Sequence, residues 1–157
     1  PRSGGGWRLD TPAGEIVADR IVNAAGLWAR EVGQMAGVHL PLQPIEHQYV
    51  ITEAIPELVE LGFEVPLTRD YDMEFYSRQE GQGLLVGAYE RDCRTWSDRG
   101  TPWNFGQELL PGDLDRIEPN LLQAIERMPA MGNAGIRRVI NGPMVFSPDV
   151  LPLVGPV

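Results

Sequence analysis

Two histidines are the residues of this chain best suited to proton transfer near neutral pH, and they stand in different settings. His39 lies in a connecting segment, where we expect an exposed side chain. His47 lies in the segment 45–52, whose alternation predicts a strand with His47 and Tyr49 on one face. A polar ring among apolar neighbours must be hydrogen-bonded or functional. The residues alone favour a structural role for His47 over a catalytic one, and both interpretations stay open.

A second chemical grouping is expected on the segment 73–78, which also has the pattern of a strand. Tyr76 and Arg78 share one face of it because they are two residues apart. With His47 they would supply an aromatic wall, a proton-transfer group and an anchor for a carboxylate. The ordinary alternative is a cross-strand tyrosine and a solvated arginine, which the residues by themselves favour.

The turn at residues 23–26, Asn-Ala-Ala-Gly, is the sharper signal for a cofactor. It follows an expected strand at 16–22, predicted to be buried on both faces, and precedes an expected helix at 27–36. Strand, small-residue turn and helix form the unit of a doubly wound α/β sheet, whose ligands bind at the carboxyl ends of the strands. No Gly-x-Gly-x-x-Gly fingerprint occurs, so this turn does not identify a cofactor alone.

Composition excludes several classes of function. All 13 basic residues are arginine, so Schiff-base chemistry and a P-loop lysine are excluded within these 157 residues. A net charge of −9 argues against a nucleic-acid partner or an anionic membrane surface. Cys93 is the single cysteine, and no His, Asp or Glu spacing matches a metal site, so we expect none. No apolar run approaches the roughly 20 residues of a membrane-spanning helix.

The first residue and the apolar last stretch suggest a fragment of a longer protein.

The elements that must position these residues change character along the chain. Its beginning resembles α/β sequence, its middle favours antiparallel strands with a covering helix, and near residue 140 we expect a return to the first type. The expected elements, besides those above, are a first strand at 7–9, a helix or turn at 54–61, strands at 66–69 and 84–89, a loop at 91–106, a helix at 113–128 with Pro119 near its first turn or at a kink, a strand at 136–140, and a turn at 147–149.

Five segments taken together carry a more specific signal. They are 21–33, 46–50, 76–80, 83–90 and 141–155. In this order and at these spacings they strongly resemble the FAD-dependent amine oxidoreductases of the D-amino-acid-oxidase superfamily, most closely the dimethylglycine dehydrogenases, with the sarcosine dehydrogenases as near neighbours. The resemblance extends over essentially the whole chain from Thr11 onward.

The resemblance implies an α/β fold with an α+β insertion: part of a Rossmann-like FAD-binding domain interrupted by a mainly antiparallel-sheet substrate domain. Residues 1–36 would belong to the FAD-binding domain, 37–138 to the substrate domain, and 139–157 to the return into the FAD-binding domain. The family's glycine fingerprint, its flavin-attachment histidine and a later glycine-rich segment would lie outside this chain, with most of the FAD site. Tetrahydrofolate enters as a candidate second cofactor of the full-length protein.

The family's site residues map onto individual positions here. Its strand-end flavin contact falls on Ala25, Gly26 and Trp28, and its active-site histidine and tyrosine fall on His47 and Tyr76. This reverses the odds that the residues alone gave for His47 and Tyr76. We therefore expect both to be catalytic.

The reaction implied by the resemblance is oxidative demethylation of an N-methyl glycine such as dimethylglycine, by hydride transfer to FAD. His47 would hold the amine in its neutral form, Tyr76 would wall it, and Arg78 is the candidate ligand of the substrate carboxylate. Some relatives carry two adjacent tyrosines where this chain has Tyr76-Ser77, which leaves the substrate preference open.

Two alternatives remain. One is an oxidase or dehydrogenase of sarcosine or another secondary amino acid, and the other is a catalytically silent, flavoprotein-like regulatory module. The expected partners are a small amino-acid substrate and an electron-transfer flavoprotein, with no nucleic acid and no membrane. The expected location is the cytoplasm in a bacterium or the mitochondrial matrix in a eukaryote.

Overall fold

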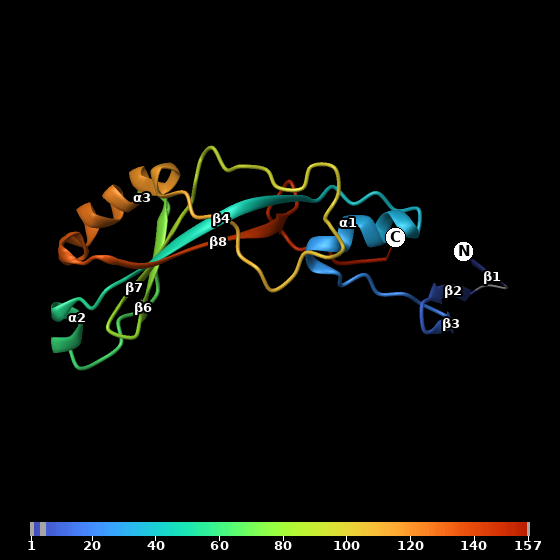
Figure 1. Ribbon diagram of the computed structural model, residues 1–157, viewed down its shortest axis with the longest axis horizontal. Coiled ribbons are helices and arrows are strands. Elements are labelled where there is room, and N and C mark those ends of the chain that lie inside the picture. The colour runs from blue at the N-terminus through green and yellow to red at the C-terminus, as the bar shows by residue number, and fades with distance from the viewer. Residues whose placement is uncertain (1, 4–5, 157) are drawn as a thin grey trace. The chain divides into compact units, whose positions relative to one another are not determined.

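The computed structural model describes residues 2–3 and 6–156, which divide into two compact units. The first unit comprises Pro1–Pro44, Ser97–Asn104 and Val145–Val157, and the second comprises Ile45–Trp96 and Phe105–Met144. Figure 1 shows the elements of both in chain order. None of the helices among the described residues has the length and apolar character needed to cross a lipid bilayer.

The first unit begins with a small antiparallel sheet in the order β1-β2-β3, formed by Arg2–Ser3, Gly6–Thr11 and Gly14–Ala18. The predicted hairpin is confirmed, and its turn closes where Thr11 pairs with Gly14. The predicted burial of its last strand on both faces is wrong: Ile16 is 54% exposed and Val17 71%. β3 is the edge strand of this sheet, and among the described residues its apolar side chains are not covered.

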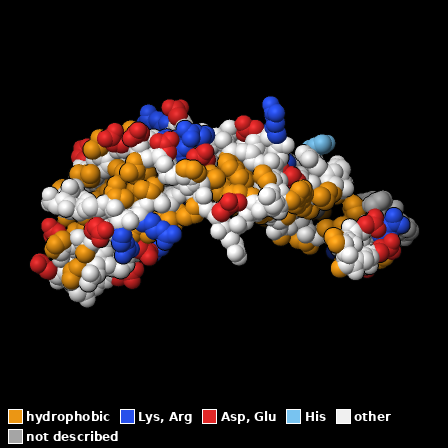
Figure 2. All heavy atoms as spheres, viewed as in Figure 1, with side chains coloured by type: hydrophobic (Ala, Val, Ile, Leu, Met, Phe, Trp, Pro, Cys, Tyr) orange, Lys and Arg blue, Asp and Glu red, His pale blue; other side chains and the backbone are white. Residues whose placement is uncertain are grey.

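The small-residue turn in the first unit leads into a helix, as predicted. A 3-10 turn at Gly26–Trp28 is followed by the short helix α1, Ala29–Met35. Gly37, with φ +77°, ends it in the left-handed conformation that glycine adopts without strain. The strand predicted up to residue 22 stops at Ala18, and Val22 is 86% exposed. Exposed apolar side chains of this kind are visible among the charged ones in Figure 2.

The second unit is built on a five-stranded sheet in the order β5-β6-β7-β4-β8. The pairs β5–β6, β6–β7 and β7–β4 are antiparallel. Gly81, with φ +63°, occupies the two-residue connection between β6 and β7, which confirms the predicted hairpin. The strands of this sheet are β4 (Gln43–Thr52), β5 (Thr68–Asp70), β6 (Phe75–Glu80), β7 (Gly83–Ala88) and β8 (Ile136–Phe146). The helices that accompany it are α2 (Pro56–Glu60), α3 (Leu114–Arg127) and a 3-10 turn (Pro129–Asn133).

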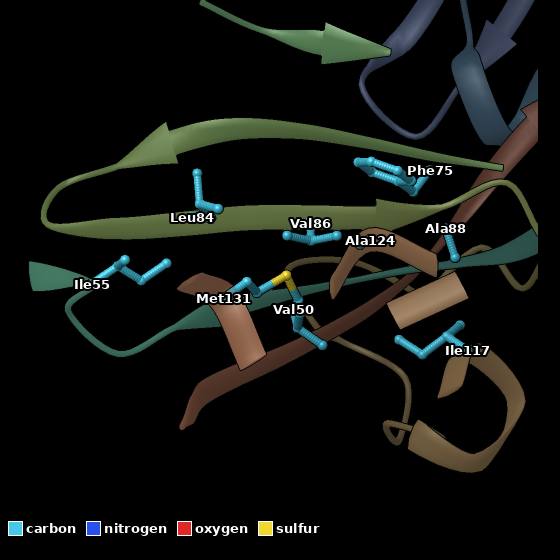
Figure 3. Packing of buried hydrophobic residues seen from close by; sticks show 9 residues of the cluster. All are labelled: Val50, Ile55, Phe75, Leu84, Val86, Ala88, Ile117, Ala124 and Met131. Carbon is cyan, nitrogen blue, oxygen red and sulfur yellow. The ribbon is translucent and has the colours of Figure 1, made fainter. Parts of the chain in front are cut away.

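Helix α3 covers one face of this sheet and buries the core of the second unit (Figure 3). Its helical spacing brings Ile117 and Ala124 to the sheet, where both are fully buried. Each fully buried large side chain of this type contributes about 1.5–3 kcal/mol of transfer free energy. The core residues are Val50, Ile55, Phe75, Leu84, Val86, Ala88, Ile117, Ala124 and Met131.

The ends of α3 lie where the sequence places them. Asp113 caps the first turn by accepting a hydrogen bond from the backbone N–H of Arg116 at 3.3 Å. Pro119 lies within the helix rather than in its first turn, so one backbone hydrogen bond of the helix is missing there.

The strand β8 is longer than predicted. The Asn-Gly-Pro sequence at 141–143 was expected to follow its end, but β8 continues through it to Phe146. Asn141 explains the difference: its backbone carbonyl accepts a hydrogen bond from the Leu110 N–H at 2.9 Å, and its side chain is buried. Tertiary contacts therefore satisfy a segment whose local sequence favours a turn.

Candidate active site

The face of the five-stranded sheet that points away from α3 carries the predicted catalytic residues; we call it the tyrosine face. Tyr49 pairs with Gly87, and Gly87 pairs with Tyr76, so these three residues form one row across β4, β7 and β6. Side chains alternate along each strand, which puts His47 on the face of Tyr49. All four tyrosines of the chain are in or beside this group, since Tyr89 packs against Tyr76 and the ring of Tyr71 stacks on that of Tyr89.

His47 and Tyr76 meet on this face although they are 29 positions apart in the sequence. The distance from His47 Nε2 to the Tyr76 hydroxyl oxygen is 3.0 Å, within hydrogen-bond range. Their rings are nearly parallel, with centroids 5.8 Å apart and an interplanar angle of 12°. The structure thus brings together the two residues that the sequence singles out for proton transfer.

The surroundings keep both groups neutral. Burial lowers the pKa of His47 below its ordinary 6.5, and the positive charge of Arg116 lowers it further. Burial raises the pKa of Tyr76, and the neighbouring Tyr89 and Tyr49 raise it further. At neutral pH, His47 is therefore an imidazole that can accept a proton, beside a phenol that keeps its own. Which of the two donates in their hydrogen bond depends on the histidine tautomer.

Two arginines flank Tyr76. Arg78 is two residues further along β6, and its Nη2 forms an ion pair with Glu80 Oε2 at 2.7 Å while its side chain stays half exposed. Arg69 lies opposite Tyr76 in the pair β5–β6. Arg69 is thus a second arginine beside Tyr76, in addition to the predicted carboxylate ligand Arg78, and the sequence alone did not single it out.

A buried ionic cluster secures the opposite side of the strand that carries His47. Arg116 Nη1 on α3 lies 2.8 Å from Glu46 Oε2, and Arg116 Nε lies 2.6 Å from Glu90 Oε2. Asn141 Nδ2 donates to Glu46 Oε2 at 2.9 Å. Burial works to raise the pKa of Glu46, but the hydrogen bonds from Arg116 and Asn141 outweigh it and lower that pKa. The cluster joins α3, β4 and β8, and it was not predicted from the sequence.

The predicted flavin contact lies in the first unit, where the turn at 23–26 borders a cavity of about 340 Å³. Residues from two segments far apart in the sequence, 23–29 and 145–153, line it together with two leucines. Gly26 adopts φ +55°, a conformation that a side chain would strain. The lining residues are Asn23, Ala24, Ala25, Gly26, Ala29, Leu40, Leu42, Val145, Phe146, Ser147, Val150, Leu151, Pro152 and Leu153.

The cavity's lining fits part of a flavin. Its small and branched apolar side chains can pack against the face of an aromatic ring, and Asn23 and Ser147 add a small number of polar groups to the lining. Trp28 is not part of the lining: its indole Nε1 donates to the Pro102 carbonyl at 3.0 Å. The chain has no diphosphate-binding glycine fingerprint, so these residues suit one end of FAD rather than the whole cofactor.

Comparison with known proteins places the chain in a family. Mouse (Mus musculus) mitochondrial dimethylglycine dehydrogenase is 49% identical over 161 residues, covering 99% of this chain and 18% of that protein. Mouse mitochondrial sarcosine dehydrogenase is 37% identical over 147 residues, covering 94% of this chain and 15% of that protein. The chain therefore spans less than a fifth of the length of either relative.

The fold is also found among solved structures. L-proline dehydrogenase from P. horikoshii superposes with a TM-score of 0.70 at 24% identity, covering 96% of this chain and 37% of that one, which supports the α/β architecture with antiparallel sheets. The sequence profile described as "DAO: FAD dependent oxidoreductase" matches residues 1–157. Since that match covers the whole chain, the chain belongs to the DAO family of FAD-dependent oxidoreductases.

Proposed function

We propose that the protein containing this chain oxidatively demethylates an N-methyl glycine, with dimethylglycine as the foremost substrate. The observation that carries the proposal is the pair of neutral groups on the tyrosine face, His47 Nε2 and the Tyr76 hydroxyl, 3.0 Å apart. The 49% identity to a dimethylglycine dehydrogenase supports the choice of substrate. Sarcosine is the next candidate, supported by the 37% identity to a sarcosine dehydrogenase.

The tyrosine face has the groups that an N-methyl amino acid needs. Aromatic faces attract an ammonium group carrying methyl substituents, because the ring quadrupole is negative on its face. Tyr76 and Tyr89, with ring centroids 5.4 Å apart, provide two such faces beside His47. These residues would bind the substrate through its amine and leave its carboxylate to an arginine.

His47 is the proposed proton acceptor. A protonated amine has no lone pair to assist loss of hydride from its methyl group, so the ammonium proton must leave first. The imidazole is neutral because burial and Arg116 lower its pKa, and it can take that proton at Nε2 or Nδ1 according to its tautomer. Tyr76 orients the ring through the hydrogen bond to Nε2.

Arg78 is the proposed ligand of the substrate carboxylate. Its ion pair with Glu80 joins two partly exposed side chains, with relative exposures of 50% and 35%. Exposed pairs of this kind contribute about 0–1 kcal/mol, so an incoming carboxylate can take the place of Glu80. A planar guanidinium binds a carboxylate through two parallel hydrogen bonds, which also fixes its orientation.

Ala25 and Gly26, which line the cavity of the first unit, and Trp28, which lies outside that lining, are proposed to contact FAD. When bound, the flavin supplies the acceptor for the hydride. The division into a FAD-binding domain at 1–36 and 139–157 and a substrate domain at 37–138 belongs to this proposal. The discontinuous first unit supports it, although that unit also includes Ser97–Asn104. The proposal also includes an electron-transfer flavoprotein as electron acceptor and tetrahydrofolate as second cofactor. For a eukaryotic source it includes a mitochondrial location.

The test uses the full-length protein, purified with its cofactor and mixed anaerobically with a panel of amines. Flavin absorbance is followed by stopped flow with dimethylglycine, sarcosine, proline and glycine. We expect dimethylglycine to give the highest second-order rate constant for flavin reduction. Faster reduction by sarcosine would move the substrate to the second candidate. A protein without a flavin spectrum, or one that no amine reduces, would refute the enzyme and support the regulatory alternative.

A further inference from the structure

Tyr76 reaches His47 across an intervening strand. The sheet order places β7 between β6, which carries Tyr76, and β4, which carries His47. Neighbouring strands lie about 4.8 Å apart, so the two backbones are separated by about twice that distance. The hydrogen bond between Tyr76 and His47 therefore requires the tyrosine ring to pass over β7. The residue of β7 paired with Tyr76 is Gly87.

Gly87 provides the space that this path needs. A Cβ atom added at Gly87 would fall inside the van der Waals radii of Cζ, Cε1 and the hydroxyl oxygen of Tyr76. The backbone of Gly87 lies in an ordinary strand and has no positive φ, so conformational freedom is not the reason for glycine. The ring of Tyr76 lies directly on the bare backbone of β7, at the position where any other residue would project a side chain.

We infer that Gly87 is a positioning residue for the proposed reaction: its missing side chain allows the Tyr76 hydroxyl to meet His47 Nε2. This inference rests on the proposed function for the roles of Tyr76 and His47. It adds a third residue, which touches neither substrate nor cofactor and acts only through the tyrosine ring. It also predicts that residue size at position 87 determines whether the pair forms.

The contrast with Gly83, on the same strand, shows why Gly87 can be tested by substitution. A Cβ at Gly83 would approach the backbone oxygen of Glu53 to 2.5 Å and that of Thr52 to 2.8 Å, so the strands themselves would have to separate. At Gly87 the obstructing atoms are the far end of a flexible side chain. A methyl group there displaces the ring of Tyr76 by rotation about χ1 and leaves the pairing of β7 intact.

The experiment introduces Gly87→Ala into the full-length, FAD-loaded protein, with Gly142→Ala as the matched control. Gly142 lies in β8 of the same sheet, and a Cβ added there meets no atom within 4 Å. The crystal structure of Gly87→Ala is expected to show the Tyr76 hydroxyl beyond hydrogen-bond distance of His47. Flavin reduction by dimethylglycine is expected to slow by about tenfold in this variant only. In a Tyr76→Phe background, Gly87→Ala should add no more than about threefold.

Thermal unfolding keeps the inference testable if Gly87→Ala accumulates poorly. The substitution is expected to lower Tm in the wild-type background and to leave it unchanged in a Tyr76→Ala background, where no ring occupies the space. An equal decrease in both backgrounds would refute the inference, as would a crystal structure with Tyr76 unmoved. If Tyr76 moves while the rate and its pH profile stay unchanged, the positioning inference holds and the proposed role of Tyr76 fails.

Discussion

Two polar sites on opposite faces of the five-stranded sheet are satisfied in different ways. On the face under α3, Gln48 is fully buried and satisfied by backbone groups: Asp113 N–H donates to its Oε1 at 2.7 Å, and its Nε2 donates to the Asp113 carbonyl at 3.1 Å. On the tyrosine face, His47 and Tyr76 are half-buried and bond each other. A polar side chain tied to backbone serves the fold, whereas side chains tied only to each other can exchange that bond for a ligand.

Phe75 and Tyr76 show how one strand serves both faces. They are adjacent on β6, and alternation sends the phenylalanine into the core and the tyrosine to the opposite side. A shift of one residue in the register of β6 would exchange them. The hydrophobic core therefore fixes the position of the candidate site without contributing a residue to it.

The largest effect expected is on stability, from Phe75→Ala on the core face. Phe75 is 1% exposed, and removing its ring should lower the free energy of unfolding by about 3–5 kcal/mol. Calorimetry of the FAD-loaded full-length protein would measure this as a decrease in Tm. Tyr76→Phe is the comparison on the other face, where we expect a change of less than about 1 kcal/mol. Equal decreases for both variants would remove the distinction between the faces.

The largest effect expected on activity comes from His47→Ala. Loss of the proton acceptor should slow flavin reduction by about 10²- to 10³-fold. His39→Ala is the matched control, because His39 is the other histidine of the chain and is exposed in the first unit. Comparable losses in the two variants would show that the effect does not depend on the tyrosine face.

The pH profile sharpens the same prediction. Protonated His47 cannot accept the ammonium proton, so the reduction rate should fall as the pH falls through the pKa of His47. Because burial and Arg116 lower that pKa, the midpoint should lie below the ordinary 6.5. His47→Ala should lose this acidic limb. A wild-type midpoint above 6.5, or a limb that persists in the variant, would assign the titration to another group.

A smaller effect on rate is expected from Tyr76→Phe. The ring and its packing on Gly87 remain, while the hydroxyl that orients His47 is lost, so reduction should slow by about tenfold. Stopped-flow measurement at saturating substrate isolates this step. A rate within twofold of wild type would show that the tyrosine contributes its ring alone.

The smallest effect expected separates the two arginines beside Tyr76. Arg78→Gln should raise KM for dimethylglycine by about tenfold with little change in kcat, because a carboxylate bond formed on binding persists through the reaction. Arg69→Gln, on the neighbouring strand, should raise KM less. A larger increase for Arg69→Gln would transfer the carboxylate to Arg69, and normal KM values in both variants would exclude this pair.

Local pattern was sufficient for several elements of the second unit. Alternation predicted the strand around His47 and the shared face of Tyr76 and Arg78, and the glycine-containing connection predicted the hairpin between β6 and β7. Helical spacing predicted α3 to within a residue at each end. These signals succeed because the spacing of side chains along a helix or strand depends only on neighbouring residues.

Predictions that needed a neighbouring element were less successful. Apolar composition suggested burial for the strand around Val17, but burial depends on which elements pack on a strand, and among the described residues Val17 is 71% exposed. The Asn-Gly-Pro sequence suggested a strand end, but the Leu110 partner of Asn141 lies in a segment of its own, 31 positions away. The partners of Arg116 and the wall of the cavity in the first unit were likewise not predicted.

The sequence by itself determined the residue types available for chemistry, the absence of lysine, the face on which His47 lies within its strand, and, through resemblance, the family. The tertiary structure decided that Tyr76 crosses a strand to reach His47, that Gly87 is the residue that leaves room for it, and that Glu80 holds Arg78. The physical reason is the distance along the sequence over which each kind of interaction acts. Periodicity along one strand follows from local geometry, whereas strand order and register arise from the packing of the whole core, and they determine which side chains meet.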